Sequence, residues 1–152
     1  MSIEFVPCHK DRGFFICLAK EYVDELSEYD RRIVWDEDMW SKTMWDADFI
    51  VDGGVLCGFV CKNEVSFRGR KKILYISEFY IAKDERNRKV GLEAARGLVE
   101  GWNGDVCLYI LDRNDGAKGF WDAVERELGW ERIVRPEMKV LDGCELRVYK
   151  VG

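Results

Sequence analysis

Hydrophobic positions recur with a helical period near the start of the chain. Five apolar side chains fall on one helical face: Phe15, Leu18, Ala19, Tyr22 and Leu26. Because charged residues occupy the opposite face, the pattern predicts an amphipathic helix over roughly Asp11–Tyr29. A shorter apolar pattern follows Asp36, whose side chain is suited to cap the first turn of a second helix.

Short apolar runs separated by turn residues predict strands along the rest of the chain. In order, these runs are Ile3–Val6, Phe49–Val51, Val55–Lys62, Ile73–Ile81, Val106–Leu111, Ile133–Val134 and Leu146–Val151. Helical spacing returns twice, over Leu92–Trp102 and after Asn114. Strand and helix alternate in the middle of the chain and hairpins flank them. This order predicts an α/β fold with a mixed sheet and helices on both of its faces.

The length and composition predict one domain. The chain has 152 residues, two prolines and no low-complexity stretch, so residues 1–152 are expected to form a single folded unit. No apolar run approaches the roughly 20 residues of a membrane span, and the first ten residues lack the apolar stretch of a signal peptide. We therefore expect a soluble, cytoplasmic protein that does not bind membranes.

Charge is unevenly distributed. The formal net charge is −5, which argues against a general nucleic-acid binder. Between Glu21 and Asp48, ten acidic residues face three basic ones, a local net charge of −7 that leaves +2 for the remainder. A basic run, Arg68–Lys72, precedes the longest predicted strand. A phosphorylated ligand is expected to prefer the basic part, and a cationic amine the acidic part.

Cysteine and histidine usage points away from a metal site. The six cysteines form no Cys-x-x-Cys pair, and four of them interrupt apolar runs, so buried reduced thiols are favoured over disulfides or metal ligands. His9 is the only histidine. A histidine-based catalytic triad or a histidine-rich metal centre is therefore not expected.

The loop after the strand Ile73–Ile81 carries the clearest chemical signal. It reads Lys83-Asp84-Glu85-Arg86-Asn87-Arg88-Lys89-Val90-Gly91 and leads directly into a predicted helix. A helix N-terminus presents unpaired amide donors and a positive dipole end, both of which favour phosphate oxygens. Gly91 allows the backbone to approach a ligand closely. The loop therefore predicts a polyphosphate site; the alternative is a solvated basic loop that only caps the helix.

Two motifs in order resemble the GNAT N-acetyltransferase superfamily. The first is a strand end at Ile81, an Arg/Gln position at Arg86 and a glycine at Gly91, although Lys89 stands where relatives have their first glycine. The second is Asn114-Asp115-Gly116-Ala117-Lys118-Gly119-Phe120-Trp121, in which Trp121 replaces the usual tyrosine. Some predicted acetyltransferases share this Phe-Trp pair, so the chain is similar to that subgroup. The resemblance implies a GNAT-like, mostly antiparallel mixed sheet.

The resemblance also implies acetyl-CoA as co-substrate. The pyrophosphate would bind the amides of the loop and the first helical turn, over Arg86, Asn87, Arg88, Lys89, Val90, Gly91 and Leu92. Pantetheine would pair with the strand edge at Phe79, Tyr80 and Ile81, as an added strand does. The second motif would contribute Asn114, Ala117, Phe120 and Trp121.

Glu78 is the candidate general base. It stands in an apolar strand, on the face that simple alternation gives to Leu74, Ile76 and Tyr80. A carboxylate in such a place is costly unless it is paired or has a function. Relatives often carry an acid here that deprotonates the amine. The alternative is a structural carboxylate satisfied by amides or an arginine.

Trp121 raises a question about the proton donor. An indole N–H donates a hydrogen bond but is no acid near neutral pH. The leaving thiolate would then take its proton from solvent or from another tyrosine (Tyr80 or Tyr109), or it would leave without any general acid. Trp121 itself would be a coenzyme contact or a packing residue.

The acceptor is predicted to be a small primary amine. Carboxylates and aromatic side chains between Tyr29 and Trp45 could hold an ammonium group, and Tyr29, Asp30 and Trp35 are the candidate residues. The strand Leu74–Tyr80 also resembles that of diamine acetyltransferases. Two alternatives remain open: a non-catalytic acetyl-CoA sensor or interaction domain, and a protein or peptide N-acetyltransferase. A monomer or a homodimer is expected.

Overall fold

The computed structural model describes residues 1–66 and 72–151. Of the basic run Arg68–Lys72, only Lys72 lies within the described residues. The described chain forms one mixed sheet with strand order β1-β2-β3-β4-β5-β7-β6. The strands are β1 (Ile3–Pro7), β2 (Ala47–Asp52), β3 (Val55–Val65), β4 (Ile73–Ile81), β5 (Asp105–Leu111), β6 (Glu131–Ile133) and β7 (Cys144–Lys150). Only β4 and β5 pair in parallel; the other neighbours are antiparallel.

Three of the four helices in the described chain begin at a residue whose side chain caps the first turn. The helices are α1 (Arg12–Ser27), α2 (Glu37–Thr43), α3 (Val90–Leu98) and α4 (Asp115–Leu128), with short 3-10 turns η1 (Cys8–Asp11), η2 (Met44–Asp46) and η3 (Lys83–Glu85). The side chains of Asp11, Asp36 and Asn114 each accept a hydrogen bond from an amide in the first turn. The predicted end of α3 at Trp102 is wrong. The helix stops at Leu98, and the chain turns through Gly101 at φ 75°.

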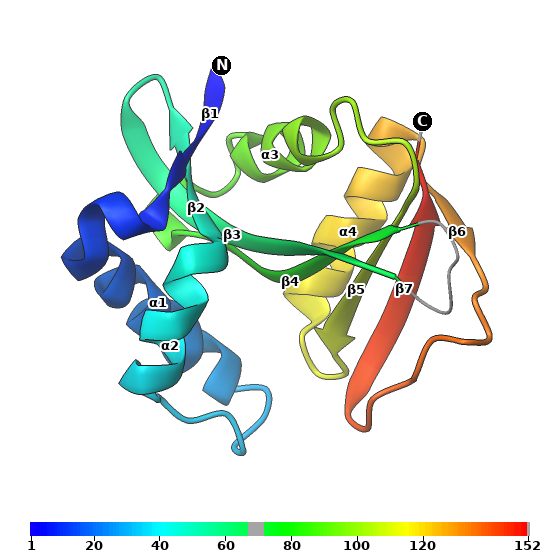
Figure 1. Ribbon diagram of the computed structural model, residues 1–152, viewed down its shortest axis with the longest axis horizontal. Helices are drawn as coiled ribbons and strands as arrows, with labels where there is room; N and C mark the ends of the chain where they lie inside the picture. Colours follow the sequence, from blue (N-terminus) through cyan, green and yellow to red (C-terminus); the bar gives the residue numbers. More distant parts are fainter. Residues whose placement is uncertain (67–71, 152) are drawn as a thin grey trace.

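Helices cover both faces of the sheet, as Figure 1 shows. One core lies between the sheet and α3 and α4; it includes Val60, Ala94 and Val124. The other lies between the sheet and α1 and α2, around Phe15 and Phe59. Phe59 and Val60 are neighbours on β3 and point to opposite faces, as strand geometry requires. The predicted α/β architecture, a mostly antiparallel mixed sheet with helices on both faces, is confirmed.

A bulge in β4 changes which face Glu78 occupies. On β3, Cys61 pairs with Glu78 whereas the next residue, Lys62, pairs with Ile76, so Ser77 is the extra residue on β4. Ile76 therefore joins the core beneath α3 and α4, while Tyr80 joins the core beneath α1 and α2. The prediction that Glu78 shares a face with Leu74 and Ile76 is wrong. The bulge directs its carboxylate to the α1 side.

β4 and β5 separate along their length. They pair only over their first three residues, from Ile73 opposite Asp105 to Tyr75 opposite Cys107. Beyond that point β4 continues to Ile81 and β5 to Leu111 without pairing, and the two strands diverge (Figure 1). The second half of β4 thus has a backbone edge turned toward a gap in the middle of the sheet.

The cysteines are not paired with one another. All six are free thiols, and Cys8, Cys57, Cys61 and Cys107 are buried. Within the described parts of the chain, no three His, Cys, Asp or Glu side chains gather as metal ligands. None of the described helices combines the length and apolarity that crossing a membrane requires.

Candidate functional site

A cavity of about 600 Å³ opens where β4 leaves β5. Its walls come from the end of α1, the second half of β4, the loop after β4, the start of α3 and one side of α4. The lining is mainly apolar, with charged and amide groups at the loop and at the ends of the helices. Thirteen of the fourteen predicted coenzyme residues line it: Phe79, Tyr80, Ile81, Arg86, Asn87, Lys89, Val90, Gly91, Leu92, Asn114, Ala117, Phe120 and Trp121.

The loop before α3 turns its backbone toward this cavity. Asn87 and Lys89 both adopt the left-handed conformation, with φ of 65° and 64°. Lys89 is the N-cap of α3, but its side chain makes no capping bond, and Glu93 is the residue that donates to its carbonyl, at 3.0 Å. The amides of Val90, Gly91 and Leu92 precede that bond, so they remain available to an anion. The Lys89 side chain is exposed, which leaves the helix end open.

Gly91 sets the distance between α3 and α4. A Cβ atom at this position would lie 2.7 Å from Cε1 of Phe120 and 3.5 Å from Cγ1 of Ile81. The first turn of α3 can therefore pack against the Phe120 ring only because residue 91 has no side chain. This requirement is independent of backbone conformation, since Gly91 lies inside a regular helix.

The two arginines of the loop are engaged with protein groups. Arg86 donates from Nε to the carbonyl of Ile81 at 2.8 Å and forms a bidentate pair with Glu25 at 2.9 and 2.8 Å. It therefore joins the end of β4 to α1 and contacts the cavity from the side. Arg88 pairs with Glu85 and, at 3.7 Å, with Asp52, and it does not line the cavity.

The wall opposite α3 is aromatic. Phe79 stacks on Phe120 with ring centroids 5.3 Å apart and meets Trp121 edge-on at the same distance. Trp121 is 5 % exposed and belongs to the core beneath α3 and α4, so it is a packing residue that also faces the cavity. Asn114 caps α4 by accepting the amide of Ala117 at 3.0 Å.

Glu78 lies beside the cavity on the α1 side. Burial raises the pKa of its carboxyl to about 7, while a hydrogen bond from the Tyr22 hydroxyl lowers that pKa by a smaller amount. Cys61, directly opposite on β3, and Tyr75 are the other titratable groups whose charges interact with it. A carboxyl group with a pKa near neutrality exists in both protonation states at physiological pH, which suits general base catalysis.

The three predicted acceptor residues are placed differently. Tyr29 lines the cavity, whereas Asp30 and Trp35 do not. Asp30 is held by Arg32 through bonds of 2.9 and 3.0 Å, which lower its pKa. Trp35 stacks on Trp40 and carries the Lys20 ammonium 5.6 Å above its ring, so the cation-binding face of Trp35 is used by the protein's own lysine.

Arg32 also connects two loops. Its guanidinium lies 3.9 Å from Asp142 and so close to Gly143 that a Cβ there would approach Nη2 to 2.9 Å. The loop between α1 and α2 therefore contacts the loop between β6 and β7. Met138 of the second loop packs with Cys107, on the face of β5 opposite Val106 and Leu108 and thus on the α1 side.

Eight residues that line the cavity were not predicted from the sequence: Tyr22, Glu25, Leu26, Glu85, Gly116, Ala123, Arg126 and Glu127. Tyr22 is the important one, because its hydroxyl contacts both Glu78 and the backbone of Phe79. Its sequence signal was a tyrosine within an otherwise aliphatic helical face. That signal identifies a buried position but not the partner of the hydroxyl group.

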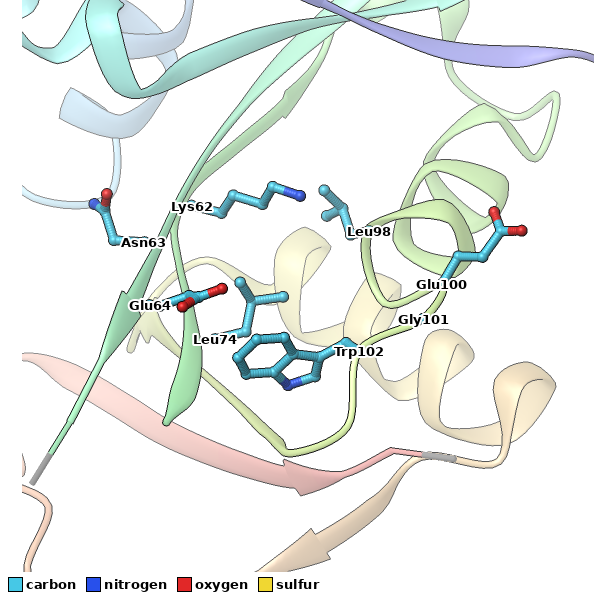
Figure 2. Close-up of a pocket in the computed structure, with 8 residues that line it drawn as sticks. All are labelled: Lys62, Asn63, Glu64, Leu74, Leu98, Glu100, Gly101 and Trp102. Atoms are coloured by element: carbon cyan, nitrogen blue, oxygen red, sulfur yellow. The ribbon is translucent and has the colours of Figure 1, made fainter. Parts of the chain in front are cut away.

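A second, smaller cavity of about 240 Å³ lies away from this site. Figure 2 shows it between β3 and β4 and the end of α3, with Leu74, Leu98 and Trp102 as an apolar floor and the Lys62 amine directed across it. Glu64 at its rim pairs with Lys72 at 3.3 Å.

Comparisons with known proteins identify the fold. A scan of protein-family models and a search of curated proteins find no match to this sequence. Among solved structures, a GNAT-family acetyltransferase from Streptococcus agalactiae aligns with a TM-score of 0.70 at 15% identity, over 97% of this chain and 93% of that one. Such low identity shows the fold alone.

Two further solved structures cover almost the whole chain. A subunit of the NatC complex bound to Gag peptide and CoA aligns with a TM-score of 0.61 at 13% identity, over 98% of this chain and 97% of that one. Arabidopsis thaliana NAA60 in complex with a bisubstrate analogue aligns with a TM-score of 0.60 at 16% identity, over 99% of this chain and 100% of that one. The chain described above therefore has the GNAT fold.

Proposed function

We propose that this chain is an N-acetyltransferase that moves an acetyl group from acetyl-CoA to a primary amine. The observation that carries the proposal is the continuous cavity that reaches from the amides at the start of α3 to Tyr22 and Phe79, beside Glu78. One end of this cavity suits phosphates and the other reaches a carboxylate that can take a proton.

The coenzyme end is supported by backbone geometry. The amides of Val90, Gly91 and Leu92 would hold pyrophosphate oxygens, and the exposed Lys89 side chain leaves them accessible. The edge of β4 beyond Tyr75 lacks pairing with β5, which leaves its backbone groups for pantetheine. Arg86 would act by fixing β4 to α1, because its guanidinium is engaged with Glu25.

Glu78 would take the proton of the attacking amine. Only a neutral amine is nucleophilic, and most primary amines are protonated at neutral pH. A carboxyl with a pKa of about 7 is a stronger base than an ordinary glutamate, and roughly half of it is ionised at neutral pH. Its position on the α1 side, set by the bulge at Ser77, would make that side the acceptor side.

A small acceptor is favoured over an extended peptide. The Arg32 contacts with Asp142 and Gly143 join the loops on the acceptor side, which leaves less room for a chain to pass between them. The acidic residues of α1 favour a cationic amine, although Lys20 already occupies the Trp35 ring. A peptide acceptor is the second candidate, because the NatC structure that this fold resembles binds a peptide.

A thiol-release screen tests the proposal. Purified protein would be mixed with acetyl-CoA and a panel of polyamines, amino acids, aminoglycosides and short peptides, and free CoA would be measured. We expect release with at least one amine, and its loss in Glu78→Gln. Binding of acetyl-CoA without release for any amine would contradict the enzyme and favour a sensor or interaction domain. Release with peptides alone would contradict the small acceptor.

A further inference from the structure

The proposed reaction leaves a thiolate that needs a proton. Trp121 stands where related sequences carry a tyrosine, and its indole N–H cannot act as an acid near neutral pH. Any hydroxyl that replaces the missing group must face the cavity and lie where the thioester would meet Glu78. Among the described residues, three tyrosines line the cavity: Tyr22, Tyr29 and Tyr80.

Two of these tyrosines are turned elsewhere. The Tyr80 hydroxyl donates to Glu21 at 3.4 Å, near the Arg86–Glu25 pair, and Arg86 lies 5.6 Å above its ring. The Tyr29 hydroxyl interacts with the same Arg86. Tyr109, a further candidate from the sequence, donates to the carbonyl of Lys139 at 2.6 Å and does not line the cavity.

Tyr22 has the required position. Its ring is fixed edge-on against Trp40 and Phe59, with centroid distances of 6.0 and 5.5 Å. Its hydroxyl lies close enough to the Glu78 carboxyl and the Phe79 backbone to interact with both, at the strand edge proposed for pantetheine. Packing therefore holds the Tyr22 ring in place, and only the hydroxyl hydrogen has to turn from Glu78 toward a ligand in the cavity.

We propose that Tyr22 is the general acid of the reaction and that it works as a pair with Glu78. As the amine nitrogen bonds to the thioester carbon, its proton passes to the Glu78 carboxylate. When the C–S bond breaks, the sulfur keeps the bonding electrons and takes the Tyr22 proton, and Tyr22 regains a proton from Glu78. One proton thus moves from nitrogen to sulfur, and both residues end the cycle as they began.

The pairing answers an energetic objection. Burial and the neighbouring Glu78 carboxylate raise the pKa of Tyr22 well above its ordinary value, whereas a thiol has a pKa near 8.5. An isolated Tyr22 would therefore give up its proton to a thiolate reluctantly. Return of a proton from Glu78 in the same step removes the need for a buried phenolate, whose charge would be costly there.

The inference rests on the proposed acetyl transfer, and Tyr22→Phe tests it. CoA release would be followed with acetyl-CoA and, as probe amines, spermidine, tryptamine and a short peptide. We expect kcat to fall about 100-fold, which is the lower end of the rate effect of a general acid. The affinity for acetyl-CoA, measured by calorimetry, should be unchanged. The solvent deuterium isotope effect on kcat should shrink toward one, which loss of packing alone would not produce. Tyr109→Phe is the matched control and should stay within about twofold of wild type.

A second readout needs no acceptor. The hydrogen bond from Tyr22 lowers the pKa of Glu78, so its removal in Tyr22→Phe should raise that pKa, followed by NMR of ¹³C-labelled glutamate carboxyls. An unmoved Glu78 pKa would overturn the pair, even for a protein that releases no thiol. The acid role alone is tested if the wild type is active on any probe amine. It would be overturned if kcat were unchanged in Tyr22→Phe, or if kcat fell in Tyr109→Phe instead.

Discussion

At the scale of single residues, burial of the Glu78 carboxyl costs folding free energy, and the same burial suits the carboxyl to act as a base. Its neighbours are Cys61 and Tyr22, and burial rather than a nearby negative charge is the main cause of its raised pKa. The same burial that would make it a good base makes its ionised form unfavourable in the folded protein. Activity and stability should therefore respond in opposite directions when Glu78 is replaced.

Glu78→Gln tests the role of this carboxyl in the rate. A base must be ionised to act, so the wild-type rate should fall as the pH drops through about 7. We expect the variant to be about 100-fold slower at pH 8, with the acidic limb of its kcat–pH profile flattened. Steady-state kinetics from pH 5.5 to 9 measures both. A variant with the wild-type profile would remove Glu78 from the mechanism.

The same substitution should stabilise the fold at alkaline pH. The folded-state pKa of about 7 lies above the ordinary value of 4.5, so the folded state binds the proton more tightly. The stability that this group contributes is thus complete below pH 4.5 and is lost as the pH rises through 7. Urea unfolding at pH 8 should show Glu78→Gln more stable than wild type, by on the order of 2 kcal/mol. At pH 4.5 the two should agree; a constant difference would contradict the burial account.

Lys89 carries a conformational strain that glycine would relieve. Its φ of 64° costs an L-residue about 1–2 kcal/mol, partly offset by the greater chain entropy of glycine. Lys89→Gly should therefore raise the free energy of unfolding by about 0.5 kcal/mol. Lys89→Ala keeps the Cβ and removes the charge, so it should bring no gain. If alanine stabilised as much as glycine, charge rather than strain would be the cause.

At the scale of elements, regular periodicity was predictable and its interruptions were not. The bounds of β4 and the capping role of Asp36 followed from local patterns. The bulge at Ser77 did not, because it depends on how β3 pairs with β4. The Glu25 partner of Arg86 and the Asp52 partner of Arg88 also lie in distant segments. Electrostatic partners across the fold have no signature in local spacing.

The packing of α3 against α4 provides a paired test with two glycines. In Gly91→Ala the new methyl group would overlap the Phe120 ring, which should cost about 1–3 kcal/mol of stability and weaken acetyl-CoA binding about tenfold or more. Gly119, on α4, has no atom within 4 Å of its added Cβ. Gly119→Ala should therefore stabilise the protein by about 0.5–1 kcal/mol through helix propensity.

Thermal unfolding and calorimetry with acetyl-CoA compare the two variants. A Gly91→Ala protein that kept wild-type affinity would show that α3 and α4 can separate without loss of the site. A Gly119→Ala protein that lost affinity would show that α4 itself must adjust on binding.

At the scale of the whole molecule, the sheet separates two regions that meet where β4 leaves β5. The α3 and α4 side holds the free amides at the start of α3, and the α1 side holds Glu78 and Tyr22. The sequence predicted most residues of the first region that line the cavity, because they lie in one continuous segment and in one helix. The second is assembled from α1, β4 and two loops, and only the folded chain shows that Tyr22 reaches Glu78.

Calorimetric titration of the protein with acetyl-CoA tests the central claim most directly, since every proposed step begins with the coenzyme in this cavity. We predict one site per chain with a dissociation constant between about 1 μM and 1 mM, weakened in Gly91→Ala. No heat and no thermal stabilisation at millimolar acetyl-CoA would contradict the account.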